Sequence, residues 1–543
     1  MPAPIWLPLS RRGGGRGVGS TPMKRLLLAL SLLTAPAIGQ AQTAQTPAPT
    51  PQYRPAYHFA PAAHWMNDPN GMVYLNGTYH LFFQYYPDGM SWGPMHWGHA
   101  TSRDLLRWQE QPIALYPDKL GYIFSGSAVV DENNTAGFGK NALVAIFTHH
   151  DPEEEKKKTG KHETQSLAYS LDEGKTWTKY AGNPVLKNPG IPDFRDPKVS
   201  WNAQARKWIM TLATKDRITF YSSPNLKDWT KESEFGEQVG AHGGVWECPD
   251  LFPLTLDKKT YWVLLVNLNP GGPNGGSATQ YFVGQFDGKT FRPQTNTTKW
   301  ADYGPDEYAG VTFANTGNRC LFLGWMSNWD YAQQVPTAPW RSAMTLPREL
   351  GLRQVGKELY LTSAPVKEVA SMVTSSRIRP LTNFNAGKAS AAAQPLTDLA
   401  VKGEIDLLQQ MQTQWRPQSR LQLRARQLQD MTLVLSNAQG EELLIGFDKK
   451  ANQYFIDRSK AGPSGFSPKF AARHVAPRLS SAPAADLTLF FDAASVELFA
   501  DGGLTAMTEI FFPSAPFTSL RLRPTPGLTL DSVEYTWLLT PTK

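Results

Sequence analysis

Between residues 68 and 325 the chain repeats one pattern of polar and hydrophobic positions five times. In each repeat, a strand that carries polar and acidic residues is followed by a turn and then by a strongly apolar strand. The predicted strand pairs are 68–74 with 79–83, 124–127 with 142–147, 194–201 with 207–212, 246–254 with 261–266, and 308–314 with 320–325. Such repetition indicates an architecture in which neighbouring units bury each other's apolar faces.

Several repeats end in a turn that leads to an aromatic residue. These outer segments are 102–108, 170–177, 223–229 and 286–291. A turn followed by an aromatic residue fits an edge hairpin that packs on the strands beneath it. No long helical periodicity competes with this interpretation. The pattern therefore predicts an all-β fold, a five-bladed β-propeller, in which only short and protected strand edges remain. If the first strand of each blade lines the central axis, distant residues meet in one funnel.

A different pattern follows residue 365. A short helical pattern at 366–373 and an Ala-rich stretch at 386–393 lead into short alternating strands separated by Gly and Asp turns. The predicted strands are 421–425, 431–435, 442–447, 487–491, 496–499 and 508–512. Short alternating strands of this kind indicate a β-sandwich. We therefore expect the propeller at 56–365 and the sandwich at 366–543.

The N-terminal segment has the three parts of a secretory signal peptide. Lys24-Arg25 precedes an apolar run at 26–38, and Gly39-Gln40-Ala41 follows it. The run is too short to span a membrane comfortably. We expect residues 1–41 to be an N-terminal extension with the signal peptide, and 42–55 to be a linker rich in Thr, Pro, Gln and Ala. The mature chain is then periplasmic or extracellular, without an integral membrane segment.

Composition adds bounds on partners and redox chemistry. The 543 residues suffice for two domains, and a net charge of +7 is too modest to suggest nucleic-acid binding. The charged run 153–158 neutralises itself and is expected to be a solvated loop. Of the two cysteines, Cys248 and Cys320, the first is expected to pack as a small buried hydrophobe. A chain of this size does not need a disulfide.

Three acidic motifs lie on the polar strands. The first spans 64–71 (His-Trp-Met-Asn-Asp-Pro-Asn-Gly), the second 194–198 (Phe-Arg-Asp-Pro-Lys) and the third 246–249 (Trp-Glu-Cys-Pro). Taken singly, the first is good turn chemistry and the second a local Arg–Asp ion pair at a strand end. Hydrolysis of a glycosidic bond, however, requires two carboxyl groups, one ionised and one protonated.

Together the three motifs resemble those of glycoside hydrolase family 32, the β-fructofuranosidase group of invertases, inulinases and levanases. The resemblance runs from about Tyr57 to the C-terminus. It implies that Asp68 is the nucleophile, that Glu247 is the general acid and base, and that Asp196 stabilises the oxocarbenium-like transition state. It also implies retention through a fructosyl-enzyme, with the Asp68 and Glu247 carboxyl groups roughly 5–5.5 Å apart.

The neighbours of each acid predict its protonation. Amide donors from Asn67 and Asn70 favour the charged form of Asp68. Trp246 and Cys248-Pro249 provide a less polar setting that raises the pKa of Glu247 by about one to two units. Arg195 is expected to lower the pKa of Asp196 and keep it ionised.

The resemblance further implies a fructose pocket, in which amides and hydroxyls bond the sugar OH groups and aromatic rings pack on its apolar patches. Its members are Asn67, Gln84, Trp92, Phe124, Ser125, Arg195 and Trp325. For each residue taken alone, core packing is the alternative. His96 and His99 have no third convergent ligand, so hydrogen bonding is expected rather than a metal site, and no cofactor is implied.

Segments 326–331 and 339–350 are similar to the exo-acting levanase and inulinase branch. We therefore expect an exported retaining exo-β-fructosidase that releases terminal β-D-fructofuranosyl residues from levan, inulin and sucrose. The alternatives are a sucrose-preferring invertase or a fructosyltransferase, or a non-catalytic fructan-binding protein. An arabinan-type hydrolase shares the architecture, but its motifs differ. The sequence leaves linkage preference and oligomeric state open.

Overall fold

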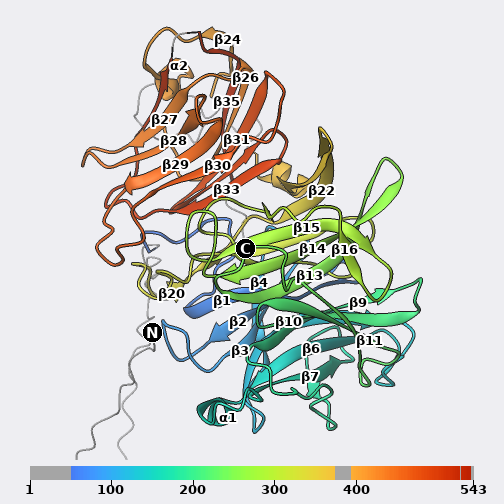
Figure 1. Ribbon diagram of the computed structural model, residues 1–543. Helices are drawn as coiled ribbons and strands as arrows, with labels where there is room; N and C mark the ends of the chain where they lie inside the picture. The colour runs from blue at the N-terminus through green and yellow to red at the C-terminus, as the bar shows by residue number, and fades with distance from the viewer. Residues whose placement is uncertain (1–50, 374–392, 526, 540–543) are drawn as a thin grey trace, which may run out of the picture. The chain divides into compact units, whose positions relative to one another are not determined.

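The computed structural model describes residues 51–373, 393–525 and 527–539, which belong to one compact unit. The predicted extension and signal peptide, linker residues 42–50 and Ala-rich residues 386–392 lie outside the described residues. Within the described part, no helix is long and apolar enough to cross a membrane. The structure consists almost entirely of β-strands (Figure 1).

Five sheets form an N-terminal β-propeller. The first blade consists of β1 (His64–Leu75), β2 (Thr78–Tyr86), β3 (His96–Ser102) and β4 (Gln109–Leu115). The second consists of β5 (Tyr122–Asp131), β6 (Ala142–His150), β7 (Glu163–Ser170) and β8 (Thr178–Lys179). The third consists of β9 (Phe194–Asn202), β10 (Lys207–Thr214), β11 (Arg217–Ser223) and β12 (Thr230–Phe235). The fourth blade is β13 (Val245–Leu256), β14 (Lys259–Asn269), β15 (Ala278–Phe286) and β16 (Phe291–Pro293), with β17 (Lys299–Trp300) on β15. The fifth is β18 (Tyr308–Thr312), β19 (Leu321–Met326), β22 (Arg348–Val355) and β23 (Glu358–Pro365), with β21 (Ala343–Met344) on β19.

The first strand of each blade lies in an inner ring. Strand β1 contacts β5, β5 contacts β9, β9 contacts β13, β13 contacts β18, and β18 contacts β1. Strand β20 (Trp340–Arg341), which follows β19 in the sequence, pairs in parallel with β1 and so adds an edge strand to the first blade. The expectation that the polar strands line one axis is confirmed.

The second strands are buried on both faces, which explains their continuous apolar sequence. Every residue of β6 is buried, for example. Apolar side chains from facing blades pack together, as where Ile146 and Leu167 of the second blade meet Met210 and Leu212 of the third. The apolar second strand recurs in every repeat because its side chains pack between neighbouring blades.

The predicted outer turns join the third and fourth strands of the first four blades. After β3, Asp104 Oδ1 accepts hydrogen bonds from the backbone N–H groups of Leu106 at 3.1 Å and Arg107 at 2.8 Å. Asp172 and Asn225 occupy equivalent turns after β7 and β11. These side-chain-to-backbone bonds are what the Ser-x-Asp/Asn pattern encodes.

The charged run 153–158 is not the predicted loop throughout, because Pro152–Lys156 form the short helix α1. Asp151 caps this helix by accepting hydrogen bonds from the N–H groups of Glu153 and Glu154. A proline in the first turn and acidic side chains there also favour a helix start. The expected solvation holds, since the helix has no buried residue.

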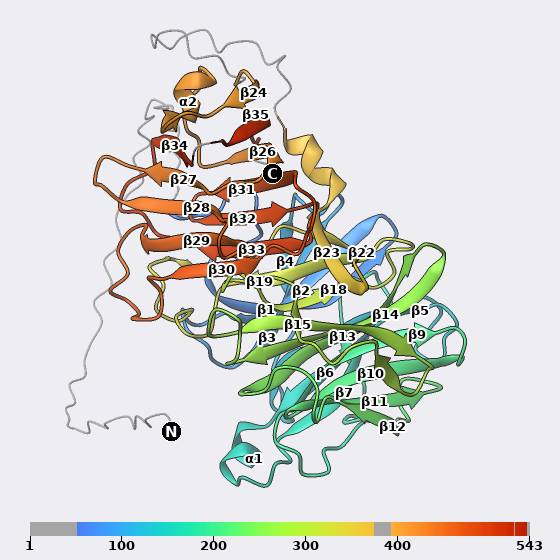
Figure 2. The same cartoon turned by 45° about the horizontal axis from the view of Figure 1, so that its top comes forward.

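Two six-stranded sheets form the C-terminal β-sandwich. One has the order β24 (Leu396–Ala400), β35 (Thr529–Trp537), β26 (Ser419–Gln427), β31 (Ala485–Asp492), β32 (Ser495–Ala500), β33 (Thr505–Ile510). The other has the order β25 (Ile405–Asp406), β34 (Ser519–Pro524), β27 (Met431–Ser436), β28 (Glu442–Asp448), β29 (Gln453–Lys460), β30 (Arg473–Pro477), and the run from β27 to β30 is visible in Figure 2. The 3₁₀ helix η1 (Lys367–Met372) occupies the predicted helical stretch, and α2 is Leu407–Gln410. The domain boundaries at 365 and 366 stay predictions.

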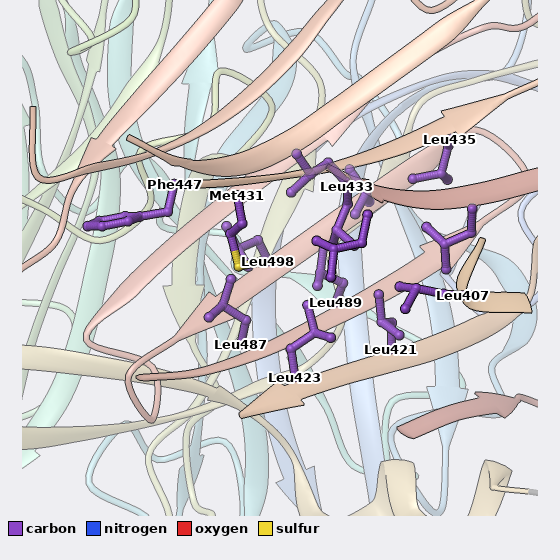
Figure 3. Packing of buried hydrophobic residues seen from close by; sticks show 14 of the residues in the cluster. Leu407, Leu421, Leu423, Met431, Leu433, Leu435, Phe447, Leu487, Leu489 and Leu498 are labelled. Carbon is purple, nitrogen blue, oxygen red and sulfur yellow. The ribbon is translucent and has the colours of Figure 1, made fainter. Parts of the chain in front are cut away.

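The sandwich core lies between the inner faces of its sheets. Figure 3 shows Leu421 and Leu489 of one sheet pointing toward Leu433 of the other, and all three are fully buried. Alternate residues of β26 are buried, as the period of two for a half-buried strand requires.

A buried ionic network joins propeller strand β22 to sandwich strands β31 and β32. Arg348 pairs with Asp302 at 2.8 Å and with Glu497 at 2.6 Å. His58 lies between Glu497 and Asp492, 2.9 Å from each carboxylate. Burial alone would lower the pKa of His58, but the two carboxylates raise it to about 9. His58 is therefore a buried cation at neutral pH.

Candidate active site

Each of the five inner strands contains a β-bulge at the same place in its blade. In every blade, two residues of the inner strand stand opposite one residue of the second strand. The bulges are 67–68 opposite Gln84, 124–125 opposite Thr148, 196–197 opposite Leu212, 248–249 opposite Val266, and 309–310 opposite Gly324. A bulge bends its strand and changes the direction of its side chains. Asp68 and Asp196 lie within bulges, and Glu247 immediately precedes one.

Three of the bulges begin with a residue in the left-handed region. The φ angles are 63° at Asp196, 42° at Cys248 and 53° at Ala309. Non-glycine residues avoid this region, and each such residue costs about 1–3 kcal/mol that surrounding contacts must offset. Backbone strain of this kind thus occurs within two of the three acidic motifs, at Asp196 and Cys248.

Asp68 receives hydrogen bonds on both carboxylate oxygens. Asn67 Nδ2 donates to Oδ1 at 2.9 Å, and Ser125 Oγ donates to Oδ2 at 2.8 Å. The thiol of Cys248 lies 3.5 Å from Oδ2. Asn70, the other predicted donor, bonds instead to the backbone oxygen of Asp68 at 3.3 Å. These hydrogen bonds fix the orientation of the Asp68 carboxyl group.

Glu247 is held between a cation and a phenol. Arg195 donates to Glu247 Oε1 from Nη2 at 2.9 Å and from Nε at 3.2 Å, and the hydroxyl of Tyr308 donates to Oε2. Burial raises the pKa of Glu247, against the opposing effects of Arg195 and Tyr308. The predicted direction of this shift agrees, and burial is its main cause. The side chain still keeps 20% of its surface exposed, so a ligand can reach it.

Asp196 differs from the prediction. Its Oδ2 accepts a hydrogen bond from the backbone N–H of Cys248 at 2.9 Å. Burial, with the nearby charges of Glu247 and Asp68, raises its pKa to about 8, although Arg195 acts in the opposite direction. The expected net lowering was wrong because burial and the two neighbouring acids outweigh the charge of Arg195, whose hydrogen bonds go to Glu247, Glu163 and Asp193 among the described residues.

The three acids from blades one, three and four therefore converge. The thiol of Cys248 is 3.5 Å from Asp68 and 3.6 Å from Asp196, and Glu247 is its chain neighbour. Three carboxyl groups this close repel one another when ionised, so at least one favours the protonated form. The site thus places a carboxyl group that accepts hydrogen bonds on both oxygens beside two whose pKa is raised, an arrangement that suits acid-assisted glycoside hydrolysis.

Two family profiles match consecutive parts of the chain. The N-terminal domain of glycosyl hydrolases family 32 matches residues 58–363, and the family's C-terminal domain matches residues 375–536. The chain belongs to this family. The match agrees with the resemblance drawn from the three acidic motifs.

Characterised family 32 proteins resemble the chain over most of its length. A levanase of Bacillus subtilis is 45% identical over 90% of this chain and 72% of its own. An extracellular exo-inulinase of Aspergillus niger is 40% identical, over 94% of this chain and 98% of its own. The crystal structure of the exo-inulinase from Aspergillus awamori superposes with a TM-score of 0.79 at 38% identity, covering 90% of this chain and 99% of that one.

Four of the predicted pocket residues lie at the first two bulges of the family 32 propeller. Asn67 and Gln84 stand at the bulge of blade one, and Phe124 and Ser125 form that of blade two. Gln84 is buried, and its Nε2 has no hydrogen-bond partner among the described residues. An unpaired buried amide costs free energy that a bound hydroxyl can recover.

The two predicted tryptophans lie in contrasting places. Trp92 is 40% exposed and meets the edge of Phe124, with ring centroids 6.0 Å apart. Trp325 is fully buried and packs against both Trp65 and Trp329. Trp92 is therefore free to contact a ligand, whereas Trp325 belongs to the aromatic core beneath the site. Their roles in sugar binding stay predictions.

Sequence reasoning missed two residues that control Glu247. Tyr308 occupies the same place before its bulge as Glu247 and Arg195 do before theirs, so aligning the five repeats could have identified it. Glu163 pairs with Arg195 at 3.0 Å. Burial would raise the pKa of Glu163, but Arg195 and His150 lower it to about 2. Glu163 begins a buried third strand, and no motif marks it.

The remaining candidates are two histidines and the two cysteines. His99 Nε2 lies 3.1 Å from His80 Nδ1, and His96 Nδ1 lies 2.9 Å from the backbone oxygen of Pro94. Both cysteines are free. Cys248 is buried, as expected, but its thiol also faces two acids rather than packing only as a hydrophobe.

Proposed function

We propose that the protein is a retaining exo-β-fructosidase that hydrolyses terminal β-D-fructofuranosyl residues of levan, inulin and sucrose. The observation that carries the proposal is that Asp68 and Glu247 both lie on the inner ring, close enough for the charge of Asp68 to raise the pKa of Glu247. Asp68 accepts hydrogen bonds from Asn67 and Ser125, whereas burial raises the pKa of Glu247 and favours its protonated form.

In the first step, Asp68 attacks the anomeric carbon of the terminal fructose, and Glu247 gives its proton to the leaving glycosidic oxygen. The glycosidic bond breaks, and a fructosyl ester of Asp68 forms. In the second step, Glu247, now ionised, takes a proton from water, whose oxygen attacks the same carbon and releases Asp68. Arg195 stabilises ionised Glu247 between the two steps, because its guanidinium lies 2.9 Å from Oε1.

Asp196 is proposed to contact the fructose ring rather than to act in proton transfer. Its Oδ2 already accepts a hydrogen bond from the N–H of Cys248, which fixes its orientation. Because its raised pKa favours the protonated form, Asp196 is proposed to hydrogen bond the hydroxyl groups of the bound fructose. Gln84, Phe124 and Trp92 are proposed to complete the pocket.

The substrate class is supported by what the relatives are called. The levanase and the extracellular exo-inulinase are named for action on two fructans, and both are at least 40% identical to this chain. A sucrose-preferring activity is the second candidate, because an invertase of Saccharomyces cerevisiae is 38% identical over 75% of the chain. The name of the exo-inulinase and the segment 24–41 also support export.

The test is the product profile on levan, inulin and sucrose. We expect fructose as the sole product from both polymers, and at least a thousandfold loss of kcat in Asp68→Asn and Glu247→Gln, which remove the nucleophile and the acid. Glu237→Gln, at an exposed carboxylate, is the control. In the presence of methanol, retention yields methyl β-D-fructofuranoside. In assays without methanol, longer oligosaccharides or fructosyl-transfer products, or levan binding without hydrolysis, would refute the exo-hydrolase.

A further inference from the structure

At one end of the second blade, two histidines lie close to one carboxylate oxygen of Glu163, and none of these three residues takes part in the proposed proton transfers. His150 ends β6, and His162 and Glu163 meet it at the start of β7. His150 Nδ1 is 3.4 Å and His162 Nε2 is 4.0 Å from Glu163 Oε1. One ligand atom from each residue lies within 4.8 Å of the other two.

This arrangement is close to what a transition-metal cation requires. Tetrahedral Zn²⁺ with His and carboxylate ligands places neighbouring donor atoms about 3.3 Å apart. His150 keeps its other nitrogen, Nε2, 3.3 Å from Glu155 Oε2. A carboxylate behind a ligating histidine orients the ring and strengthens it as a ligand. Small side-chain adjustments would therefore bring the donor atoms to bonding distance.

His162 has a ring that the fold leaves available. Its Nδ1 is buried without a hydrogen-bond partner among the described residues, and its Nε2 faces Glu163 only at 4.0 Å. The side chain of His162 is 13% exposed and that of Glu155 is 56% exposed, so a cation can enter from solvent.

We propose that His150, His162 and Glu163 bind a divalent transition-metal cation of the Zn²⁺ class, and that this cation inhibits the enzyme by competing with Arg195 for Glu163. The binding part stands independently of the proposed function. The inhibitory part rests on it, because it acts through Glu247.

The connection to the acid is a single side chain. Arg195 donates to Glu163 Oε1 from Nη1 at 3.0 Å and to Glu247 Oε1 from Nη2 at 2.9 Å. A cation on Glu163 takes the oxygen to which Nη1 donates and repels the guanidinium. Arg195 then loses one of its anchors, and the added positive charge favours ionised Glu247, which cannot act as a general acid.

The local charge tolerates such a cation beside an arginine. Arg195 is surrounded by carboxylates from Glu163, Asp193 and Glu247, and Glu155 lies behind His150. His150 also stacks on Phe124 with ring centroids 4.3 Å apart. Metal binding therefore fixes a ring that borders the proposed sugar pocket, which gives a second route to lower activity.

The test uses the full chain and Co²⁺ as a spectroscopic probe. We expect one Co²⁺ per chain with the strong visible absorption of tetrahedral coordination, displaced by Zn²⁺. His162→Gln should weaken binding by about tenfold or more, and His162→Cys, which supplies another ligand atom, should restore it. His242→Gln is the matched control, since the exposed His242 has its Nε2 3.0 Å from the backbone oxygen of Gly236 and no carboxylate partner among the described residues. Absence of bound Co²⁺, or equal binding by His162→Gln, would overturn the site.

Inhibition is measured separately as the rate of fructose release with and without Zn²⁺, each variant being compared with its own metal-free rate. We expect Zn²⁺ to lower kcat in the unmodified protein, a chelator to reverse the effect, and His162→Gln to resist it. Binding without inhibition would overturn the coupling through Arg195. A metal-free protein that releases no fructose would refute the proposed function, and the Co²⁺ spectrum would still decide the site.

Discussion

Removal of the Tyr308 hydroxyl gives the most direct test of what sets the pKa of Glu247. It donates to Glu247 Oε2, while Arg195 occupies Oε1. Tyr308 is itself buried, and burial with the charge of Glu247 raises its pKa well above the ordinary value. Tyr308 therefore stays a neutral donor, and Tyr308→Phe removes one hydrogen bond with little change of shape.

The expected shift follows from the strength of that bond. A hydrogen bond to a charged group contributes about 1.5–3 kcal/mol, equivalent to about 1–2 pKa units. Protonated Glu247 also accepts a hydrogen bond, so we expect the lower end, a rise of about 1 unit in the pKa of Glu247. Because Glu247 must be protonated to act as the acid, the alkaline limb of kcat/KM should move to higher pH by this amount.

The assay is the pH profile of kcat/KM for fructose release. Tyr454→Phe is the control, since Tyr454 donates to Asp501 at 2.8 Å in the sandwich, as Tyr308 does to Glu247 in the propeller. The control should lose stability without a change in the pH profile. An alkaline limb that stays in place or moves to lower pH in Tyr308→Phe would show that the phenol does not set the protonation of Glu247.

Two further predictions concern buried charges. The pKa of His58, raised from 6.5 to about 9, corresponds to about 3 kcal/mol of folding stability, which is fully present below pH 6.5 and is lost as the pH rises through 9. Measurements of the free energy of unfolding against pH should show this loss. His58→Gln should be less stable than the unmodified protein at pH 6, and its stability should not fall between pH 7 and 9. In Arg195→Lys, the lysine side chain cannot contact Glu163 and Glu247 in the geometry of the guanidinium. We therefore expect kcat to fall about a hundredfold while the Tm changes little. An unchanged kcat would mean that the guanidinium does not position Glu247.

Much of the fold could be predicted because its signals are local. Alternation, apolar second strands and Asx-type turns each depend on a few neighbouring residues, so the five blades and the sandwich strands are legible along the chain. The helix α1 was not predicted, because the run 153–158 was interpreted from its charges alone and the helix cap at Asp151 was overlooked. Local chemistry was present there and was misinterpreted.

Protonation was harder to predict, because it depends on groups that the chain brings from far away. Arg195 is adjacent to Asp196 in sequence, yet its guanidinium bonds to Glu247 and Glu163, 52 and 32 positions away. The bulges cause this, since they turn consecutive side chains of one strand toward different partners. Burial then raises the pKa of Asp196 to about 8, against the expectation from its neighbour alone.

The sequence by itself determined the repeat, the order of propeller and sandwich, and the three acidic motifs that carry the family resemblance, because each depends on residues that are close together in the chain. The tertiary structure alone decided which oxygen meets which donor. Tyr308 and Glu163 acquire their contacts with Glu247 and Arg195 only when blades two, three, four and five close around one axis. Desolvation and charge proximity are properties of that closed ring, and no single strand contains them.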